Sequence, residues 1–304
     1  MKSDLYLQNG LIVTDSADFI GGIVVHDGVI IEVVAGDAPM DAHEIINVHG
    51  KVIMPGVIDS HTHLQEPGRS HWERYTKATM AGAAGGVTTV MDMPVDSTPS
   101  TVNKISLKLK RDIVQTDAYI DCAQWGGLVD NNLHDLDDLH AEGVIGLKAF
   151  MVETGIDDFK RVNDDLLYAG LLRTRKTGNV IGVHAENQWV TRYLTEKLQA
   201  SGRVDLQAWL DSRPPVTELE AINRAIFWAQ ATSGNLHILH TTIASGVEAV
   251  AEARREGVNV TVETCPHYLF FDESDFFLLF RADFRSYPTY LLVVSICKIL
   301  VLGD

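Results

Sequence analysis

The sequence predicts an α/β fold in which parallel strands alternate with helices and close into a barrel of the TIM-like (β/α)8 type. From Val52 onward the chain contains short, almost wholly apolar runs, which is the pattern of parallel strands buried on both faces. Segments of helix length separate these runs. Regular alternation of the two kinds of element favours a barrel over an open sheet.

Seven barrel strands are predicted, and an eighth is not evident in the sequence. The predicted strands cover residues 52–59, 87–93, 118–128, 144–150, 180–183, 236–239 and 258–263. The clearest helix signal is Thr217 with Glu220 three residues later, a capping box ahead of the amphipathic run 221–231. The barrel is therefore predicted to be incomplete within this sequence.

The first fifty residues show a different pattern, that of a small β unit. Short strands are predicted over residues 5–13, 21–26 and 29–34, and an Asp27-Gly28 turn joins the last two. We interpret residues 1–51 as the N-terminal part of a β-sandwich domain.

Two further segments complete the predicted organisation. Residues 52–275 form the incomplete barrel, which is the catalytic domain on this interpretation. Residues 276–304 have no clear period of 2 or 3.6 and few polar side chains, so we predict an apolar tail that is foreign to the fold.

Composition restricts the class of partner. The chain has 304 residues, 46% of them hydrophobic, and a formal net charge of −16, which argues against nucleic-acid or anionic-membrane surfaces. The cysteines are too few and too scattered for a disulfide framework, and the N-terminus lacks the apolar core of a signal peptide. The apolar run 287–302 is too short to span a bilayer. We expect a cytoplasmic protein with a small-molecule substrate and neither a nucleic acid nor a membrane as partner.

The strongest chemical signal is the pair His61 and His63, where the first barrel strand ends. Two histidines at i and i+2 of an extended chain point the same way, so both imidazoles can bind one cation. An isolated pair of this kind is more often a packing or surface feature. Here it lies at a carboxyl strand end, where the active sites of such barrels are found.

Three more predicted strand ends carry suitable groups, namely Lys148, His184 and His240. A lysine within an apolar strand is costly as an ammonium ion, so we expect a depressed pKa or a covalent modification, unless an ion pair holds it. Each histidine alone could be an ordinary core residue. Convergence of all five side chains on one edge of the barrel is what predicts a metal centre.

These residues resemble those of the cyclic amidohydrolases in the amidohydrolase superfamily, and the resemblance covers residues 1–275. It implies two divalent metal ions, zinc first, with cobalt, iron, manganese or nickel as alternatives. His61 and His63 are implied to hold one ion and His184 and His240 the second. An N6-carboxylated Lys148 is implied to bridge them. Relatives of this kind are commonly homotetramers.

Departures from neighbouring subfamilies narrow the implied substrate. Dihydroorotases carry an arginine where this chain has Gln65, and hydantoinases or dihydropyrimidinases carry a tyrosine where it has Glu153. Residues 66–75 are similar to allantoinases over their whole length, and so is the Cys265-Pro-His-Tyr segment, whose Cys265 we interpret as a packing thiol. The resemblance implies hydrolysis of allantoin to allantoate in purine catabolism, with the other two subfamilies as alternatives.

The catalytic acid/base of the family, an aspartate at the end of strand eight, has no counterpart that we can identify. Asp283 and Asp304 lie beyond residue 275 but do not follow a suitable strand. A truncation or frameshift near residue 276 is one interpretation, and it implies turnover at least about a hundredfold slower than in an intact relative. An inactive fragment and a non-catalytic partner of an intact homologue are the remaining alternatives.

Overall fold

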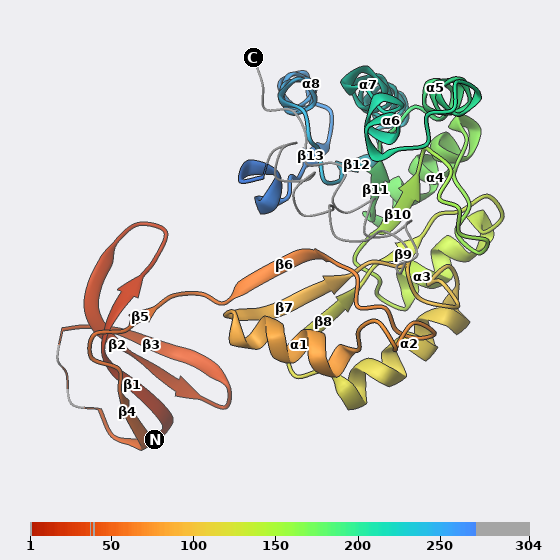
Figure 1. Cartoon of the computed structure of the whole chain (residues 1–304). Coiled ribbons are helices and arrows are strands. Elements are labelled where there is room, and N and C mark those ends of the chain that lie inside the picture. Colours follow the sequence, from red (N-terminus) through yellow and green to blue (C-terminus); the bar gives the residue numbers. More distant parts are fainter. Residues whose placement is uncertain (1, 37, 39, 272–304) are drawn as a thin grey trace. The chain divides into compact units, whose positions relative to one another are not determined.

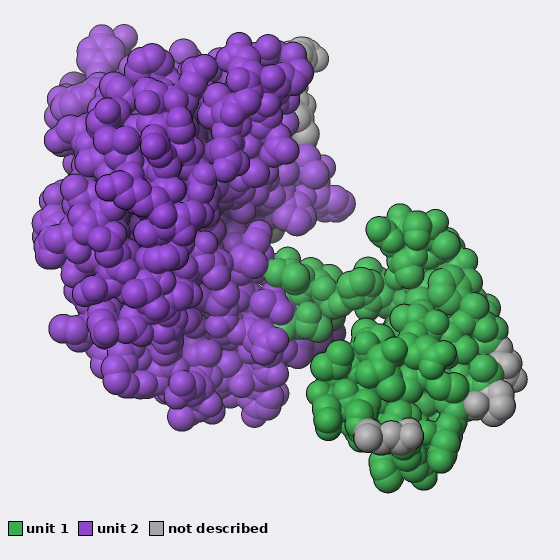
Figure 2. All heavy atoms as spheres, turned by 180° about the vertical axis from the view of Figure 1, so that it is seen from behind, with its two compact units in different colours: residues 1–58, 86–88 green, residues 59–85, 89–304 purple. Residues whose placement is uncertain are grey.

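The structure is a computed structural model that describes residues 2–36, 38 and 40–271. It divides into two compact units, shown in different colours in Figure 2. One unit contains residues 1–58 and 86–88, and the other contains residues 59–85 together with the chain from residue 89 onward. The predicted tail, residues 276–304, and any eighth strand lie outside the described residues.

The N-terminal unit is a single five-stranded sheet. Its strands are β1 (Ser3–Val13), β2 (Asp18–His26), β3 (Val29–Ala35), β4 (Ala42–Asn47) and β5 (Val52–Ile53). The order is β3-β2-β1-β4, and β5 also pairs with β1. The hairpins β1-β2 and β2-β3 are antiparallel, whereas β4 and β5 run parallel to β1.

The predicted turn between the second and third strands is confirmed. Asp27 and Gly28 have φ angles of 50° and 72°, the left-handed pair that a two-residue hairpin turn needs to match the twist of its strands. Buried Tyr6, Val24 and Ala42 form the small core of this unit. The sheet of the N-terminal unit is thus predictable from its turn and its alternating strands.

The second unit contains the predicted barrel strands, apart from the first two residues of β6 and of β7, which are grouped with the first unit. They are β6 (Val57–Thr62), β7 (Val87–Asp92), β8 (Asp121–Gln124), β9 (Gly126–Gly127), β10 (Leu147–Phe150), β11 (Val180–His184), β12 (Asn235–Ile238) and β13 (Val260–Val262). They form two sheets, of order β6-β7-β8 and β9-β10-β11-β12-β13. The pairs β7-β8 and β9 through β13 are parallel.

Two strand predictions need correction. The run 52–59 is not one barrel strand, because Val52 and Ile53 pair with β1 in the N-terminal sheet and the barrel strand starts at Val57. The run 118–128 is divided into β8 and β9 at Trp125, whose N–H donates to the carbonyl of Asp92 over 2.9 Å. Apolar pattern marks a buried strand but does not show which sheet it joins.

Helices separate most of these strands. They are α1 (Tyr75–Ala84), α2 (Lys104–Asp117), α3 (Leu136–Ala141), α4 (Asp164–Thr177), α5 (Gln188–Ala200), α6 (Leu206–Asp211), α7 (Pro215–Thr232) and α8 (Ala244–Arg255), with 3-10 turns at Leu133–Asp135 and Pro266–Leu269. Figure 1 shows α4, α7 and α8 on one side of the β10 to β13 strands. Among the described residues, no helix combines the length and the apolar character that crossing a membrane requires.

The predicted capping box at Thr217 was wrong. Helix α7 begins two residues earlier, at Pro215, because proline at the first helical position needs no N–H partner and its fixed φ suits the helix. Thr217 instead donates its hydroxyl to the carbonyl of Pro214 over 2.8 Å. A capping box is present in α2, between Asn103 and Ser106.

Strand register sets which side chains face the helices and which face the barrel interior. Leu147, Ile181, Leu236 and Val260 are successive register partners across four strands, and all are at most 1% exposed in the main core. Because side chains alternate along a strand, the neighbouring row points the other way. That second row contains Lys148, Gly182, His237 and Thr261, so a lysine and a histidine share the interior face.

Candidate metal centre at the strand ends

The first two predicted ligands converge at the end of β6. His61 lies within the strand and His63 directly follows it, and their Nε2 atoms are 3.3 Å apart. The two rings have centroids 5.4 Å apart. The spacing of one residue on an extended chain therefore brings both imidazoles to one point, as the sequence predicted.

The other three predicted residues surround this pair. Lys148 is 1% exposed, and its Nζ lies 3.3 Å from Nε2 of His240. His184 ends β11, and its ring centroid is 4.8 Å from that of His240. The His61 and His240 rings are 5.1 Å apart. The structure thus brings all five residues into one continuous group.

Local backbone and packing hold these rings in place. His240 adopts a φ of 38°, in the left-handed region that residues other than glycine rarely occupy and that often marks functional positions. The His184 ring stacks on Phe150, its register partner, with centroids 4.7 Å apart. The Nζ of Lys148 lies 4.7 Å from the centroid of that same Phe150 ring.

Carboxylates that the sequence interpretation missed contact the outer nitrogens of the first histidine pair. Glu263, which follows β13, bonds Nδ1 of His61. Asp96 lies 2.8 Å from Nδ1 of His63, and its side chain is 4% exposed. A strand-end position was the available signal for Glu263, whereas Asp96 lies in a loop and offered none. A carboxylate on the outer nitrogen is the usual second partner of a metal-binding histidine.

The pKa values of His61 and Glu263 are both lowered in the folded protein. Burial lowers the pKa of His61 to about 3, although the bond to Glu263 acts in the opposite direction. Burial acts to raise the pKa of Glu263, but hydrogen bonds from His237 and His61 outweigh it and hold that pKa far below the usual range. At neutral pH the pair is therefore a neutral imidazole and an ionised carboxylate.

The arrangement of the pair fits a bound divalent cation. Two nitrogens each about 2.0–2.1 Å from zinc and at the tetrahedral angle lie about 3.3–3.4 Å apart. The Nε2 atoms of His61 and His63 are separated by 3.3 Å. Both outer nitrogens face carboxylates, which leaves the two lone pairs directed at the same region.

A further carboxylate, that of Glu186, lies beside His184. Glu186 Oε2 is 3.2 Å from Nε2 of His184, and Oε1 is 3.4 Å from Nε of Arg213. The Arg213 guanidinium stacks on Trp209 at 4.0 Å from the ring centroid. The sequence interpretation missed Glu186 too, although it stands only two residues after a predicted ligand.

Hydrogen bonds within residues 66–75 hold the loop that follows His61 and His63. Glu66 accepts bonds from the Tyr75 N–H over 2.8 Å and from Arg74 Nε over 3.3 Å, which supports a structural role for residues 66–75. Arg69 Nη1 lies 3.2 Å from Asp96, the carboxylate beside His63. Farther along the chain, Glu153 pairs with Arg161 over 2.8 Å.

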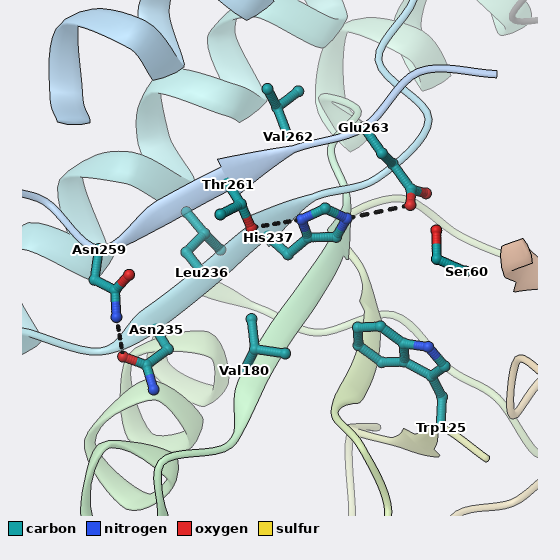
Figure 3. Close-up of a pocket in the computed structure, with 10 residues that line it drawn as sticks. All are labelled: Ser60, Trp125, Val180, Asn235, Leu236, His237, Asn259, Thr261, Val262 and Glu263. Carbon is teal, nitrogen blue, oxygen red and sulfur yellow. Dashed lines mark hydrogen bonds and ion pairs between the residues drawn. The ribbon is translucent and has the colours of Figure 1, made fainter. Parts of the chain in front are cut away.

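A cavity of about 560 Å³ is lined in part by residues of β11, β12 and β13. Its lining includes Ser60, Trp125, His237 and Glu263. Figure 3 shows His237 between Thr261 and Glu263, with the Glu263 side chain near Ser60. The cavity thus reaches Glu263, a partner of the candidate metal centre.

A model of the amidohydrolase family matches residues 52–264 of this sequence. The chain belongs to the amidohydrolase family. An allantoinase from Deinococcus radiodurans is 40% identical over 275 residues, and one from Escherichia coli O1:K1 / APEC is 40% identical over 280 residues. These alignments cover 90% and 91% of this chain and 61% of each relative. The chain thus spans about three fifths of the length of these curated relatives.

Solved structures of this amidohydrolase's relatives agree with the barrel. An L-hydantoinase (dihydropyrimidinase) from Arthrobacter aurescens matches with a TM-score of 0.85 and 30% identity, covering 90% of this chain and 60% of that one. A D-hydantoinase from Bacillus sp. AR9 matches with a TM-score of 0.78 and 30% identity, covering 89% and 59%. The prediction of an allantoinase-like amidohydrolase with a TIM-like barrel is confirmed.

Proposed function

We propose that this chain carries the metal centre of a cyclic-amide hydrolase that opens the ring of allantoin to give allantoate. The observation that supports it best is the convergence of His61, His63, Lys148, His184 and His240 into one group at the strand ends. The 40% identity to allantoinases over 90% of the chain supports the choice of allantoin.

The proposed cofactor is a pair of divalent metal ions, with zinc as the first choice and an N6-carboxylated Lys148 between them. When bound, such ions activate water and polarise an amide carbonyl. His61 and His63 hold one ion in this proposal, and His184 and His240 hold the other. Lys148 is suited to the central position because it is buried and its Nζ lies 3.3 Å from His240. Carboxylation would replace a buried cation by a carboxylate ligand.

The surrounding residues have separate tasks. Glu263 bonds Nδ1 of His61, and the Asp96 carboxylate lies 2.8 Å from Nδ1 of His63; in this proposal both carboxylates favour a proton on Nδ1, so that the Nε2 atoms remain available as ligands. Phe150 covers Lys148 and His184 on one side and limits the access of water to them. The acid/base that protonates the leaving nitrogen is not identified among the residues described above.

A hydantoinase-type activity is the second candidate, because solved hydantoinases share the fold with a TM-score of up to 0.85. Their sequence identity of 30% is lower than the 40% of the allantoinases. A dihydroorotase activity is the weaker alternative, since Gln65 is uncharged and offers no cation for a substrate carboxylate.

Metal analysis and substrate assays of the purified chain test the proposal in turn. Protein produced with zinc or cobalt and bicarbonate should hold about two ions per chain, and 13C-labelled bicarbonate should give a carbamate signal that the Lys148→Ala variant lacks. A separate group of Asp4, the half-buried His26 and Asp27 could bind a cation, so His26→Gln serves as the control. A folded sample free of metal under these conditions would overturn the metal centre.

The substrate is tested on the metal-loaded chain. We expect allantoate formation from allantoin to exceed hydantoin turnover by more than tenfold. If the chain opens the ring of hydantoin faster than that of allantoin, the proposed activity becomes that of a hydantoinase.

A further inference from the structure

We propose that Glu263 is a positioning residue of the metal centre, which fixes the tautomer of His61 and joins the end of β6 to the end of β12. This inference rests on the proposed metal-dependent function. It assigns a role to a residue that is none of the five proposed ligands.

Glu263 makes contacts in three directions. Its Oε1 bonds Nδ1 of His61 and accepts the backbone N–H of His240 over 3.2 Å. Its Oε2 lies 3.2 Å from Nε2 of His237, whose Nδ1 is 2.7 Å from the Thr261 hydroxyl. One carboxylate therefore touches one proposed ligand from each of two strand ends.

The chemistry of these contacts fixes the proton on His61. An ionised carboxylate only accepts hydrogen bonds, so the His61 proton must lie on Nδ1. Nε2 then keeps its lone pair and faces Nε2 of His63, 3.3 Å away. Without Glu263, the other tautomer would place a proton where the ion is proposed to bind.

The outer contact orients the carboxylate itself. The hydroxyl of Thr261 can donate to Nδ1 of His237, which leaves the His237 Nε2–H to donate to Glu263. Figure 3 shows this line of contacts from Thr261 through His237 to Glu263. The register of β12 and β13 creates it, because His237 and Thr261 are direct partners.

The position of Glu263 argues for positioning and against a catalytic role. Its carboxylate bonds the outer nitrogen of His61, on the side of the ring away from the pair of Nε2 atoms. A substrate approaching a metal held by those Nε2 atoms would meet the opposite edge of the ring. Glu263 therefore acts through His61 and His240.

Cobalt titration of the chain and its variants tests this role. We expect Glu263→Ala to weaken cobalt binding about 10–100-fold, the usual effect of removing an outer partner of a metal ligand. Glu263→Gln should lose less, since its amide oxygen still accepts from Nδ1–H. The absorption spectrum of bound cobalt should change in both variants. Glu256→Gln removes the same charge at an exposed position at the end of α8, and it should change neither the cobalt affinity nor the cobalt spectrum.

A second variant protects the test against misfolding. His237→Leu removes the outer contact while leaving Glu263 in place, and we expect a few-fold weaker cobalt affinity with an altered spectrum. The thermal midpoint of the metal-free protein shows that each variant is folded. If Glu263→Ala does not fold, the Glu263→Gln and His237→Leu affinities decide.

The outcomes separate this inference from the proposed function. Failure of the parent chain to bind cobalt would overturn the proposed metal centre and this inference with it. A parent chain that binds cobalt, with folded Glu263 and His237 variants of unchanged affinity and spectrum, would overturn the positioning role alone.

Discussion

Asp92 at the end of β7 and Lys110 on α2 form an ion pair of 2.7 Å in which each side chain is only 1% exposed. Lys110 also donates to the carbonyl of Met93 over 2.9 Å. The carboxylate further accepts the Tyr75 hydroxyl over 2.5 Å and the Leu64 N–H over 2.9 Å. Since Leu64 directly follows His63, this buried network anchors the backbone beside the first proposed ligand pair.

Lys110→Met should be strongly destabilising, because it leaves the Asp92 carboxylate buried without its cation. Breaking a buried ion pair in this way costs about 3–5 kcal/mol. Urea unfolding followed by circular dichroism measures the change in unfolding free energy. Lys108→Met, which removes an exposed lysine paired with Asp112 on the same helix, is the control and should change little. Equal effects of the two substitutions would contradict the structural role of the buried pair.

Asp96→Asn should weaken metal binding about tenfold or more, because it removes the negative charge that lies 2.8 Å from Nδ1 of His63. Asparagine is the appropriate replacement, since residue 96 has a φ of 73° and asparagine tolerates that region. Isothermal titration with zinc measures the affinity. Asp130→Asn, at an exposed position, supplies the matched control. Unchanged zinc affinity in a folded Asp96→Asn variant would exclude this role.

Cys122 should resist alkylation in the folded protein. Burial, with Asp92 and Asp121 nearby, raises the pKa of its thiol from 9.0 to about 11. Only the thiolate reacts, so at pH 8 the folded protein presents roughly 0.1% of the reactive form. Iodoacetamide labelling read by peptide mass spectrometry should be more than tenfold slower in the folded than in the urea-unfolded chain, and should accelerate above pH 10.

The raised pKa of Cys122 also makes the stability of the folded protein depend on pH. Because the folded pKa of Cys122 exceeds the unfolded value, its contribution is complete below about pH 9 and is lost as the pH rises toward 11. Equal labelling rates for Cys122 in the folded and unfolded chain at pH 8 would show that the thiol is not protected.

Gly146→Ala should destabilise the junction between β8 and β9. An added Cβ at this position would lie 2.4 Å from Cζ3 of the buried Trp125 ring, whose backbone N–H is bonded to the Asp92 carbonyl. Overpacking of this kind costs about 1–3 kcal/mol. Gly85→Ala, where the nearest atom is 3.4 Å from the added Cβ, is the control for thermal unfolding. A variant as stable as the parent chain would mean that Trp125 can move aside.

The features that could be predicted from the sequence are those that depend on residues close together in the chain. The i and i+2 spacing of His61 and His63 and the apolar strand ahead of Lys148 need only neighbouring residues. Glu263 was missed because its role depends on a partner 202 residues away in the chain. The predicted start of α7 was wrong because the sequence contains two helix-start motifs close together. The helix begins at Pro215, and Thr217 lies in its first turn.

The contact between His61 and Glu263 has a consequence for how the chain folds. Closing a loop of 202 residues carries an entropic cost of about 5 kcal/mol, which only a largely assembled barrel can offset. Contacts of such high sequence separation form slowly. Of the five proposed ligands, a nascent chain that meets a metal ion early therefore offers it only the two in the short His61-Thr62-His63 segment. Proper loading must wait until the strand carrying Glu263 has been synthesised and docked, so metal supplied after folding should be captured more faithfully than metal present during it.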